Sequence, residues 1–141
     1  MAQMVREVMT EEPVVLEDTA TVFDAARSMR EGDFGTVIIV KGKGGSVCGV
    51  VTDRDIVVRA VAEGRDPKSV KLGEICTADV TTVTPEEPVE KVVLLMRQRA
   101  IRRVPVVEGG KPVGVVSLGD LAMEKDEGST LADISAAPPN N

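Results

Sequence analysis

The stretch Gly49-Val50-Val51-Thr52-Asp53-Arg54-Asp55 decides how this chain folds, because its pattern occurs twice. The second copy is Gly114-Val115-Val116-Ser117-Leu118-Gly119-Asp120. In both copies a short β-branched run ends in a hydroxyl residue, and an acid follows three positions later. A buried strand that leads into a helix with an N-terminal capping box has this pattern. Each stretch therefore predicts a strand that turns directly into a helix.

The repetition extends outward from these two stretches. Residues 37–40 match residues 104–107 at an offset of 67, whereas the two quoted stretches match at an offset of 65. The first copy thus carries two extra residues in its loop 41–46, which is rich in Gly and Lys. Such a loop could cradle a phosphate, but the glycine spacings of the P-loop and of dinucleotide-binding loops are absent. A hairpin turn is the favoured interpretation.

In each copy the spacing of apolar residues changes along the chain in the same sequence of helical and extended patterns. Apolar residues at helical spacing predict one buried helix face per copy, formed by Val22, Ala25, Ala26 and Met29 and by Val89, Val92, Val93 and Met96. An extended segment precedes each helix, two β-branched runs follow it, and Ile56, Val57, Ala60 and Val61 predict a second helix face. The predicted fold class is α/β (α+β), with two β-α-β-β-α repeats. One repeat alone would leave strand surface uncovered, so we expect the two to pack sheet to sheet with pseudo-twofold symmetry.

The predicted boundaries follow composition. The first repeat covers residues 4–64, a linker with Gly, Pro and charged neighbours covers 65–71, and the second repeat covers 72–124. The tail 125–141 ends in Ala-Ala-Pro-Pro-Asn-Asn, and we expect it to be partly disordered, although Leu131 and Ile134 could dock.

Composition excludes several classes of function. The net charge is −6 and His is absent, which removes the electrostatic drive for nucleic-acid binding and all catalysis through imidazole. No apolar run approaches the ~18 residues of a membrane span, so we expect a cytoplasmic protein. Cys48 and Cys76 are too isolated for a disulfide framework or a metal site and are interpreted as small buried hydrophobes. Because no nucleophile and base are paired, the chain is not expected to be an enzyme.

The repeated turn admits two interpretations that are compatible. The hydroxyl and the acid could serve only to cap the helix. Alternatively, the hydroxyl caps while the acid stays free to accept ribose hydroxyl protons, and the backbone N–H groups at the helix start attract a phosphate.

The β-α-β-β-α repeat, the strand Val104-Pro105-Val106-Val107 and the duplicated Gly-Val-Val-[Thr/Ser]-x-x-Asp motif resemble a tandem pair of cystathionine-β-synthase (CBS) domains, a Bateman module, of the stand-alone bacterial type. The resemblance covers about residues 4–124. It implies that an adenosyl ligand such as AMP, ADP, ATP, S-adenosylmethionine or an NAD-type molecule binds in clefts between the repeats. It further implies a first site at Thr10, Gly35, Thr36, Val37, Thr52, Arg54 and Asp55. The implied second site comprises Thr77, Arg102, Arg103, Val104, Pro105, Ser117 and Asp120.

The chain departs from the family pattern at both implied sites. Ile38 stands where the family usually has the proline seen at Pro105, and Arg102 and Arg103 stand where small residues often leave room for the base. With Arg97 and Arg99 these arginines form a basic cluster. The cluster could clamp phosphates in a bidentate manner, or it could be a solvated helix end.

The predicted function is a non-catalytic regulatory module that binds an adenine nucleotide and relays its occupancy to an unknown effector protein. The alternative is a ligand-free homodimeric scaffold whose acid-bearing turns serve only as caps. A homodimer is expected in either case, because the helix faces with Val22 and Ala26 and with Val89 and Val93 could not all be covered within one chain. The sequence does not indicate which adenosyl ligand binds or which cleft it occupies.

Overall fold

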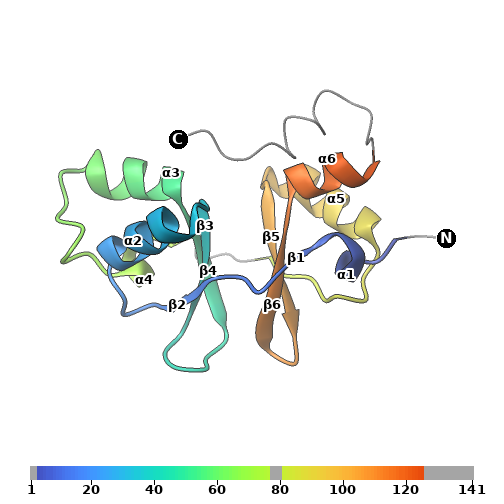
Figure 1. The fold of residues 1–141 in the computed structure, drawn as a ribbon, viewed down its shortest axis with the longest axis horizontal. Helices are drawn as coiled ribbons and strands as arrows, with labels where there is room; N and C mark the ends of the chain where they lie inside the picture. The colour runs from blue at the N-terminus through green and yellow to red at the C-terminus, as the bar shows by residue number, and fades with distance from the viewer. Residues whose placement is uncertain (1–2, 77–80, 126–141) are drawn as a thin grey trace. The chain divides into compact units, whose positions relative to one another are not determined.

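The computed structural model describes residues 3–76 and 81–125 of the chain. Thr77 and the tail from residue 126 onward, with Leu131 and Ile134, lie outside the described residues. Contacts divide the described chain into two compact units (Figure 1). We call residues 14–76 the middle unit, and residues 3–13 together with 81–125 the terminal unit. No helix in the described part of the chain is long and apolar enough to cross a membrane.

The middle unit contains one three-stranded sheet in the order β2-β3-β4. Strand β2 is parallel to β3, and β3 is antiparallel to β4. Helix α2 connects β2 to β3, and α3 continues from β4 into a π-helical segment, η1, so the predicted β-α-β-β-α order is confirmed here. The bounds are β2 Val15–Glu17, α2 Val22–Gly32, β3 Thr36–Val40, β4 Val47–Thr52, α3 Asp53–Ile56, η1 Val57–Val61 and α4 Leu72–Ile75.

The terminal unit contains a second three-stranded sheet, in the order β1-β6-β5. Among the described residues, its leading strand is represented by a parallel bridge between Val83 and Val106, which matches the pairing of Leu16 with Ile39 in the middle unit. The predicted mixed α/β fold of two related repeats is thus confirmed. The bounds are α1 Val5–Val8, β1 Thr10–Glu11, α5 Val89–Arg99, β5 Arg103–Glu108, β6 Lys111–Ser117 and α6 Leu118–Lys125.

Each unit has a core between its sheet and its helices, which cover one face of that sheet (Figure 1). The predicted helix faces are confirmed: Val22 and Ala25 of α2 are fully buried, as is Val92 of α5. Val22 and Val89 of these faces are 0% and 1% exposed, whereas Ala26 and Val93 are partly exposed, so the predicted homodimer stays a prediction.

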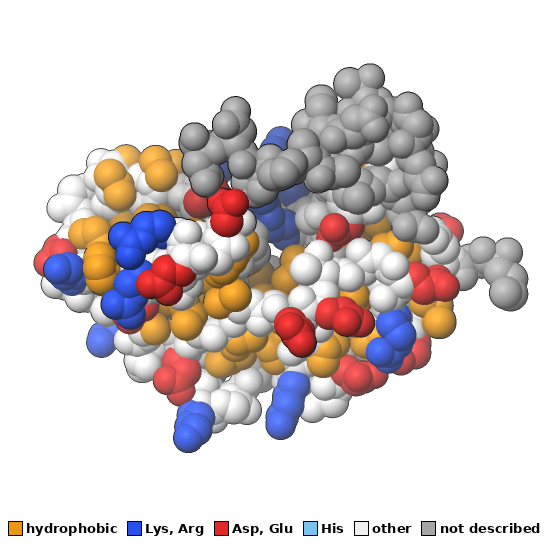
Figure 2. Space-filling view, viewed as in Figure 1, with side chains coloured by type: hydrophobic (Ala, Val, Ile, Leu, Met, Phe, Trp, Pro, Cys, Tyr) orange, Lys and Arg blue, Asp and Glu red, His pale blue; other side chains and the backbone are white. Residues whose placement is uncertain are grey.

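The segment η1 differs from its prediction. Ile56 and Ala60 are buried as expected, whereas Val57 and Val61 are 57% and 58% exposed. The apolar stripe in the sequence is wider than the face that the sheet covers, so the residues one position further around the helix point to solvent. Hydrophobic atoms are accordingly visible at the surface over η1 (Figure 2).

The short helices α1 and α4 pack outside the repeats to which the sequence assigns them. Helix α1 opens the first repeat but contributes Val5 to the core of the terminal unit. Helix α4 opens the second repeat but contributes Leu72 to the core of the middle unit. Val70, within the predicted linker, is also in that core, and its carbonyl accepts a hydrogen bond from Val22 N at 2.9 Å. The compact units therefore differ from the repeats counted along the chain.

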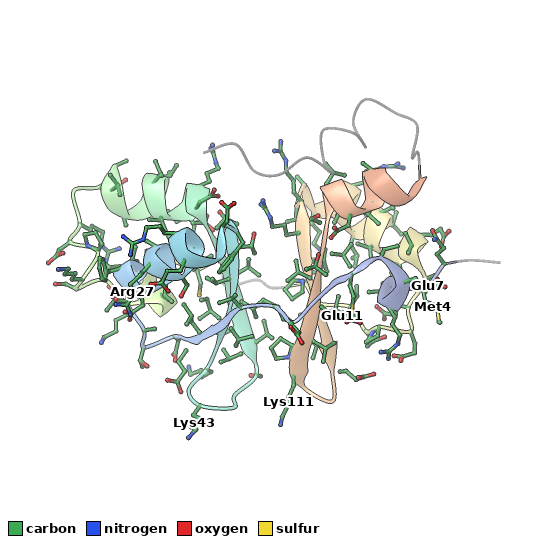
Figure 3. The ribbon with its side chains drawn as sticks, viewed as in Figure 1. Met4, Glu7, Glu11, Arg27, Lys43 and Lys111 are labelled. Atoms are coloured by element: carbon green, nitrogen blue, oxygen red, sulfur yellow. The ribbon has the colours of Figure 1, made fainter. Side chains whose placement is uncertain are left out.

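The glycine- and lysine-rich loop is a hairpin, as predicted. Lys41 N donates to Ser46 O at 3.0 Å, closing the turn between β3 and β4. Gly42 and Gly44 have φ of 64° and 69°, values that side chains with a Cβ rarely adopt. Lys43, and Lys111 in the corresponding turn of the terminal unit, extend away from the hairpins (Figure 3).

Candidate functional site

In the middle unit, β4 turns into α3 through a reciprocal capping box. Thr52 is the N-cap, and its Oγ1 accepts a hydrogen bond from Asp55 N at 3.1 Å. In return Asp55 Oδ2 accepts hydrogen bonds from Thr52 N at 2.8 Å and from Thr52 Oγ1 at 3.0 Å. These bonds satisfy backbone donors at the start of the helix, which explains why the strand ends at Thr52.

In the terminal unit, β6 turns into α6 in the same way. Ser117 Oγ accepts a hydrogen bond from Asp120 N at 3.1 Å, and Asp120 Oδ2 accepts one from Ser117 N at 2.9 Å. The duplicated sequence motif thus produces the same local geometry twice. The capping interpretation is confirmed at both turns.

The hypothesis that the acids stay free of the cap is wrong, because each acid uses Oδ2 in it. What remains for a ligand is the second carboxylate oxygen, Oδ1. Asp55 Oδ1 lies 3.8 Å from Arg59 Nε, and the Asp55 side chain is 20% exposed. Asp120 Oδ1 has no hydrogen-bond or ion-pair partner among the side chains that the structure describes, those of residues 3–76 and 81–122. Asp120 Oδ1 in the terminal turn is therefore more available to accept a hydrogen bond from a ligand than Asp55 Oδ1 in the middle turn.

The segment before the neighbouring strand lies beside each turn. In the middle unit, Asp53 N donates to Gly35 O at 3.0 Å, and Thr36 lies opposite Thr52 in the β3–β4 ladder. A Cβ on Gly35 would lie 3.0 Å from the Asp53 carboxylate, so a side chain here would displace that carboxylate. The structure thus brings four predicted residues, Gly35, Thr36, Thr52 and Asp55, into one cluster.

The terminal unit repeats this arrangement with larger side chains. Leu118 N donates to Arg102 O at 2.9 Å, and Arg103 lies opposite Ser117 in the β5–β6 ladder. Both arginines are exposed. Arg102, Arg103, Ser117 and Asp120 therefore also form one cluster.

The other predicted ligand-binding residues lie outside these two clusters of side chains. Val37 and Val104 are 0% exposed, and Pro105 is also buried. Only the backbone groups of these three residues could therefore contact a ligand. Arg54 is exposed next to the middle turn. Thr10 belongs to the terminal unit, where it pairs with Val115, and is not clustered within one unit with the other members of its predicted site.

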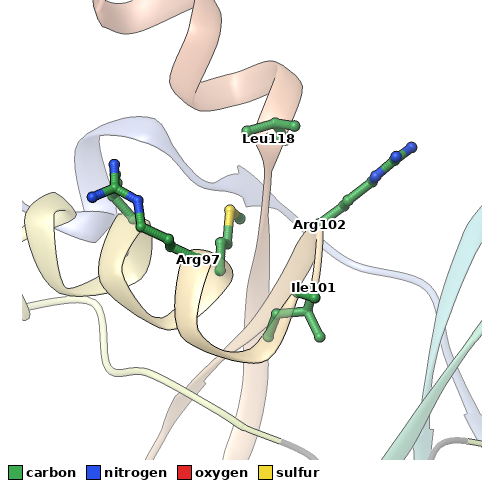
Figure 4. Close-up of a pocket in the computed structure, with 7 residues that line it drawn as sticks. Arg97, Ile101, Arg102 and Leu118 are labelled. Carbon is green, nitrogen blue, oxygen red and sulfur yellow. The ribbon is translucent and has the colours of Figure 1, made fainter.

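A pocket of about 400 Å³ opens beside the terminal turn, between the end of α5 and the start of α6 (Figure 4). Arg97 and Arg102 extend on opposite sides of an apolar lining that includes Ile101 and Leu118. Leu118 is 49% exposed and was missed as a candidate. Its place inside the repeated motif, where the first copy has Asp53, is the sequence signal that could have found it. The pocket is lined by Val93, Met96, Arg97, Ala100, Ile101, Arg102 and Leu118.

The comparisons with known proteins agree with this geometry. The family model for the CBS domain matches residues 5–61 and 72–127, which together make up most of the chain. The chain belongs to the CBS domain family. Its two strand-to-helix turns are therefore corresponding parts of a tandem CBS pair.

Two curated CBS relatives cover different shares of their own length. The chain is 38% identical over 104 residues to the mitochondrial CBS domain-containing protein CBSX3 of Arabidopsis thaliana, covering 72% of this chain but only 50% of that protein. It is 33% identical over 135 residues to the CBS domain-containing protein YhcV of Bacillus subtilis, covering 93% of this chain and 94% of that protein.

Two solved structures are also similar. The CBS domain pair of protein MJ0100, in complex with 5′-methylthioadenosine and S-adenosyl-L-methionine, has a TM-score of 0.80 at 25% identity and covers 92% of this chain and 100% of that chain. The hexameric CBS-CP12 protein from bloom-forming cyanobacteria has a TM-score of 0.79 at 34% identity and covers 88% of this chain and 72% of that chain.

Proposed function

We propose that this CBS pair is a non-catalytic regulatory module that binds an adenine nucleotide at its strand-to-helix turns and relays occupancy to an effector protein. The observation that carries the proposal is the turn built twice, each time with an acid that keeps one carboxylate oxygen outside the capping box. Such an oxygen can accept a hydrogen bond from a ribose hydroxyl, and the positive end of the helix dipole favours a phosphate nearby. The adenosyl ligands of the similar MJ0100 pair support the same ligand class.

The predicted residues divide between two proposed subsites. The middle turn would use Gly35, Thr36, Thr52 and Asp55, with Arg54 at its edge, and the terminal turn would use Arg102, Arg103, Ser117 and Asp120. Val37, Val104 and Pro105 would contribute backbone groups only. We expect a phosphate-bearing ligand to prefer the terminal turn, because two guanidinium groups flank the neighbouring pocket and Asp120 has the freer oxygen.

The test is a thermal shift with AMP, ADP, ATP, S-adenosylmethionine and NAD. A ligand at about 100 times its Kd stabilises the native state by about 2.7 kcal/mol. We expect Asp120→Ala to abolish the shift produced by the tightest ligand. Because Asp120 also caps α6, the matched control is Asp24→Ala, which removes the capping acid of α2, outside both proposed subsites. The control should lower the stability of the ligand-free chain comparably while keeping the shift.

The second candidate is a homodimeric scaffold without a ligand. It is favoured by the exposed apolar residues of η1, where Val57, Val58 and Val61 are 57%, 45% and 58% exposed. The absence of any ligand-induced shift, together with Asp120→Ala lowering only the stability of the ligand-free chain, would replace the first proposal with this one. Light scattering measures the assembly directly: a dimer that Val61→Glu dissociates supports η1 as the contact, and a monomeric wild type contradicts it.

A further inference from the structure

The two cysteines of the chain meet inside the middle unit. Cys48 lies in β4, and Cys76 directly follows α4, with 27 residues between them in the sequence. The sequence interprets both as small buried hydrophobes; both pack against the core of this unit, but they are only partly buried free thiols. Helix α4 packs against β4, and both cysteines lie against the core of the middle unit, where the nearby Cys76 contributes to raising the pKa of the Cys48 thiol. Cys76 Sγ donates to Gly73 O at 3.8 Å. Two sulfur atoms that are isolated in sequence are thus neighbours in space.

We propose that Cys48 and Cys76 form a modification site that a peroxide oxidises to a reversible intramolecular disulfide. The link would join β4 to the end of α4. The proposal does not depend on ligand binding, because neither cysteine belongs to a proposed subsite.

The reaction balances in two steps. Hydrogen peroxide oxidises one thiol to a sulfenic acid and is itself reduced, so that one water molecule is released. The second thiol then attacks the sulfenic sulfur, which forms the S–S bond and releases a second water molecule. Overall, two thiols lose two hydrogen atoms, and one peroxide molecule becomes two water molecules. A dithiol reductant reverses the change by thiol–disulfide exchange.

The surroundings suit this chemistry. Because the two cysteines pack in the same core, a local movement of their side chains can bring the sulfur atoms to the ~2.05 Å of an S–S bond. Partial exposure admits a molecule as small as hydrogen peroxide. Burial raises the pKa of the Cys48 thiol, and the neighbouring Cys76 and the Asp18 carboxylate raise it further. A raised pKa lowers the thiolate fraction of Cys48 and makes it a poor first target for peroxide, so we assign Cys48 the role of the thiol that closes the disulfide.

The disulfide would stabilise the middle unit. The closed loop from Cys48 to Cys76 contains α3 and η1, so oxidation removes conformational freedom of this segment from the unfolded chain. A loop of this length and a unit of this size predict a rise in the unfolding midpoint of about 10 °C or more if the bond is unstrained.

The experiment treats the reduced full-length chain with a small excess of hydrogen peroxide. We expect intact mass to fall by two hydrogen atoms, and peptide mapping without reduction to recover Cys48 linked to Cys76. Dithiothreitol should restore the starting mass. The unfolding midpoint of the oxidised chain should lie above that of the reduced chain.

The matched controls are Cys48→Ala and Cys76→Ala, each of which leaves one thiol. Neither can lose two hydrogen atoms within one chain, and neither should gain stability on oxidation. The proposal is overturned if the wild-type cysteines form sulfinic acids or links between chains in place of the internal link. It is equally overturned if both remain thiols under conditions that oxidise a small free thiol.

Discussion

The strand-to-helix turns of the two units share a backbone but differ in the chemistry around it. At both turns a hydroxyl residue and an acid exchange hydrogen bonds of nearly equal length. Next to them, the middle unit has Gly35 and Asp53 where the terminal unit has Arg102 and Leu118. The cap requires only the hydroxyl and the acid, so the neighbouring positions are free to differ. The middle turn therefore has the Asp53 carboxylate beside its cap, and the terminal turn has the Arg102 guanidinium beside an apolar pocket.

The largest expected effect comes from cavities made in α1 and α4, the two short helices that pack outside the repeats to which the sequence assigns them. Leu72 of α4 is 0% exposed in the middle core, and Leu72→Ala should cost about 2–5 kcal/mol. Hydrogen exchange should accelerate mainly in β3 and β4. The counterpart Val5→Ala, in α1, should instead accelerate exchange in β5 and β6. If Leu72→Ala loosens β5 and β6 first, the assignment of α4 to the middle unit is wrong.

The equality of the two caps is tested by removing each hydroxyl. Thr52→Ala and Ser117→Ala should each cost about 1 kcal/mol, since each removes the acceptor for the backbone N–H of an acid. Urea unfolding measures both. The exposed Thr82→Ala serves as the control and should change stability by no more than about 0.5 kcal/mol. A cost at only one turn would contradict the shared geometry.

The smallest expected effect concerns the starts of the two long helices. Helix α2 begins with a capping box between Thr21 and Asp24, whereas α5 begins at Pro88 without a side-chain cap. Hydrogen bonds from Thr21 lower the pKa of Asp24 from its ordinary value of 3.8. The folded state then binds fewer protons than the unfolded state at acid pH. The resulting stabilisation is fully present above about pH 4 and is lost as the pH falls through the lowered pKa.

Asp24→Asn measures this contribution. Its stability difference from the wild type, obtained by urea unfolding, should be larger at pH 6 than at pH 3. Glu90→Gln in the first turn of α5, where no side chain caps the helix, is the matched control. A difference for Asp24→Asn that stays constant with pH would show that the carboxylate charge contributes nothing to the cap.

Much of the fold is visible in short-range patterns. The i, i+3, i+4, i+7 spacing identified the buried faces of α2 and α5, and β-branched runs identified the four long strands. The hydroxyl and acid three residues apart identified both caps. These features depend on neighbours within one or two helical turns or along one strand, so the order of residues is enough to predict them.

Other features depend on which distant segments meet. The chain order assigns α1 to the first repeat and α4 to the second, but each packs in the other compact unit. The spacing of apolar residues identifies a helix face but does not determine how much of that face the sheet covers. In η1 the sheet covers only part of the apolar face, so Val57 and Val61 are exposed. The proximity of Cys48 to Cys76 within one core is likewise absent from any motif.

Local hydrogen bonding and periodicity thus specify the two turns and the elements that carry them, because the interacting groups are close in the chain. Long-range packing decides the composition of each core and the meeting of the two thiols. These outcomes result from the burial of surfaces far apart in sequence, and burial is a property of the assembled unit.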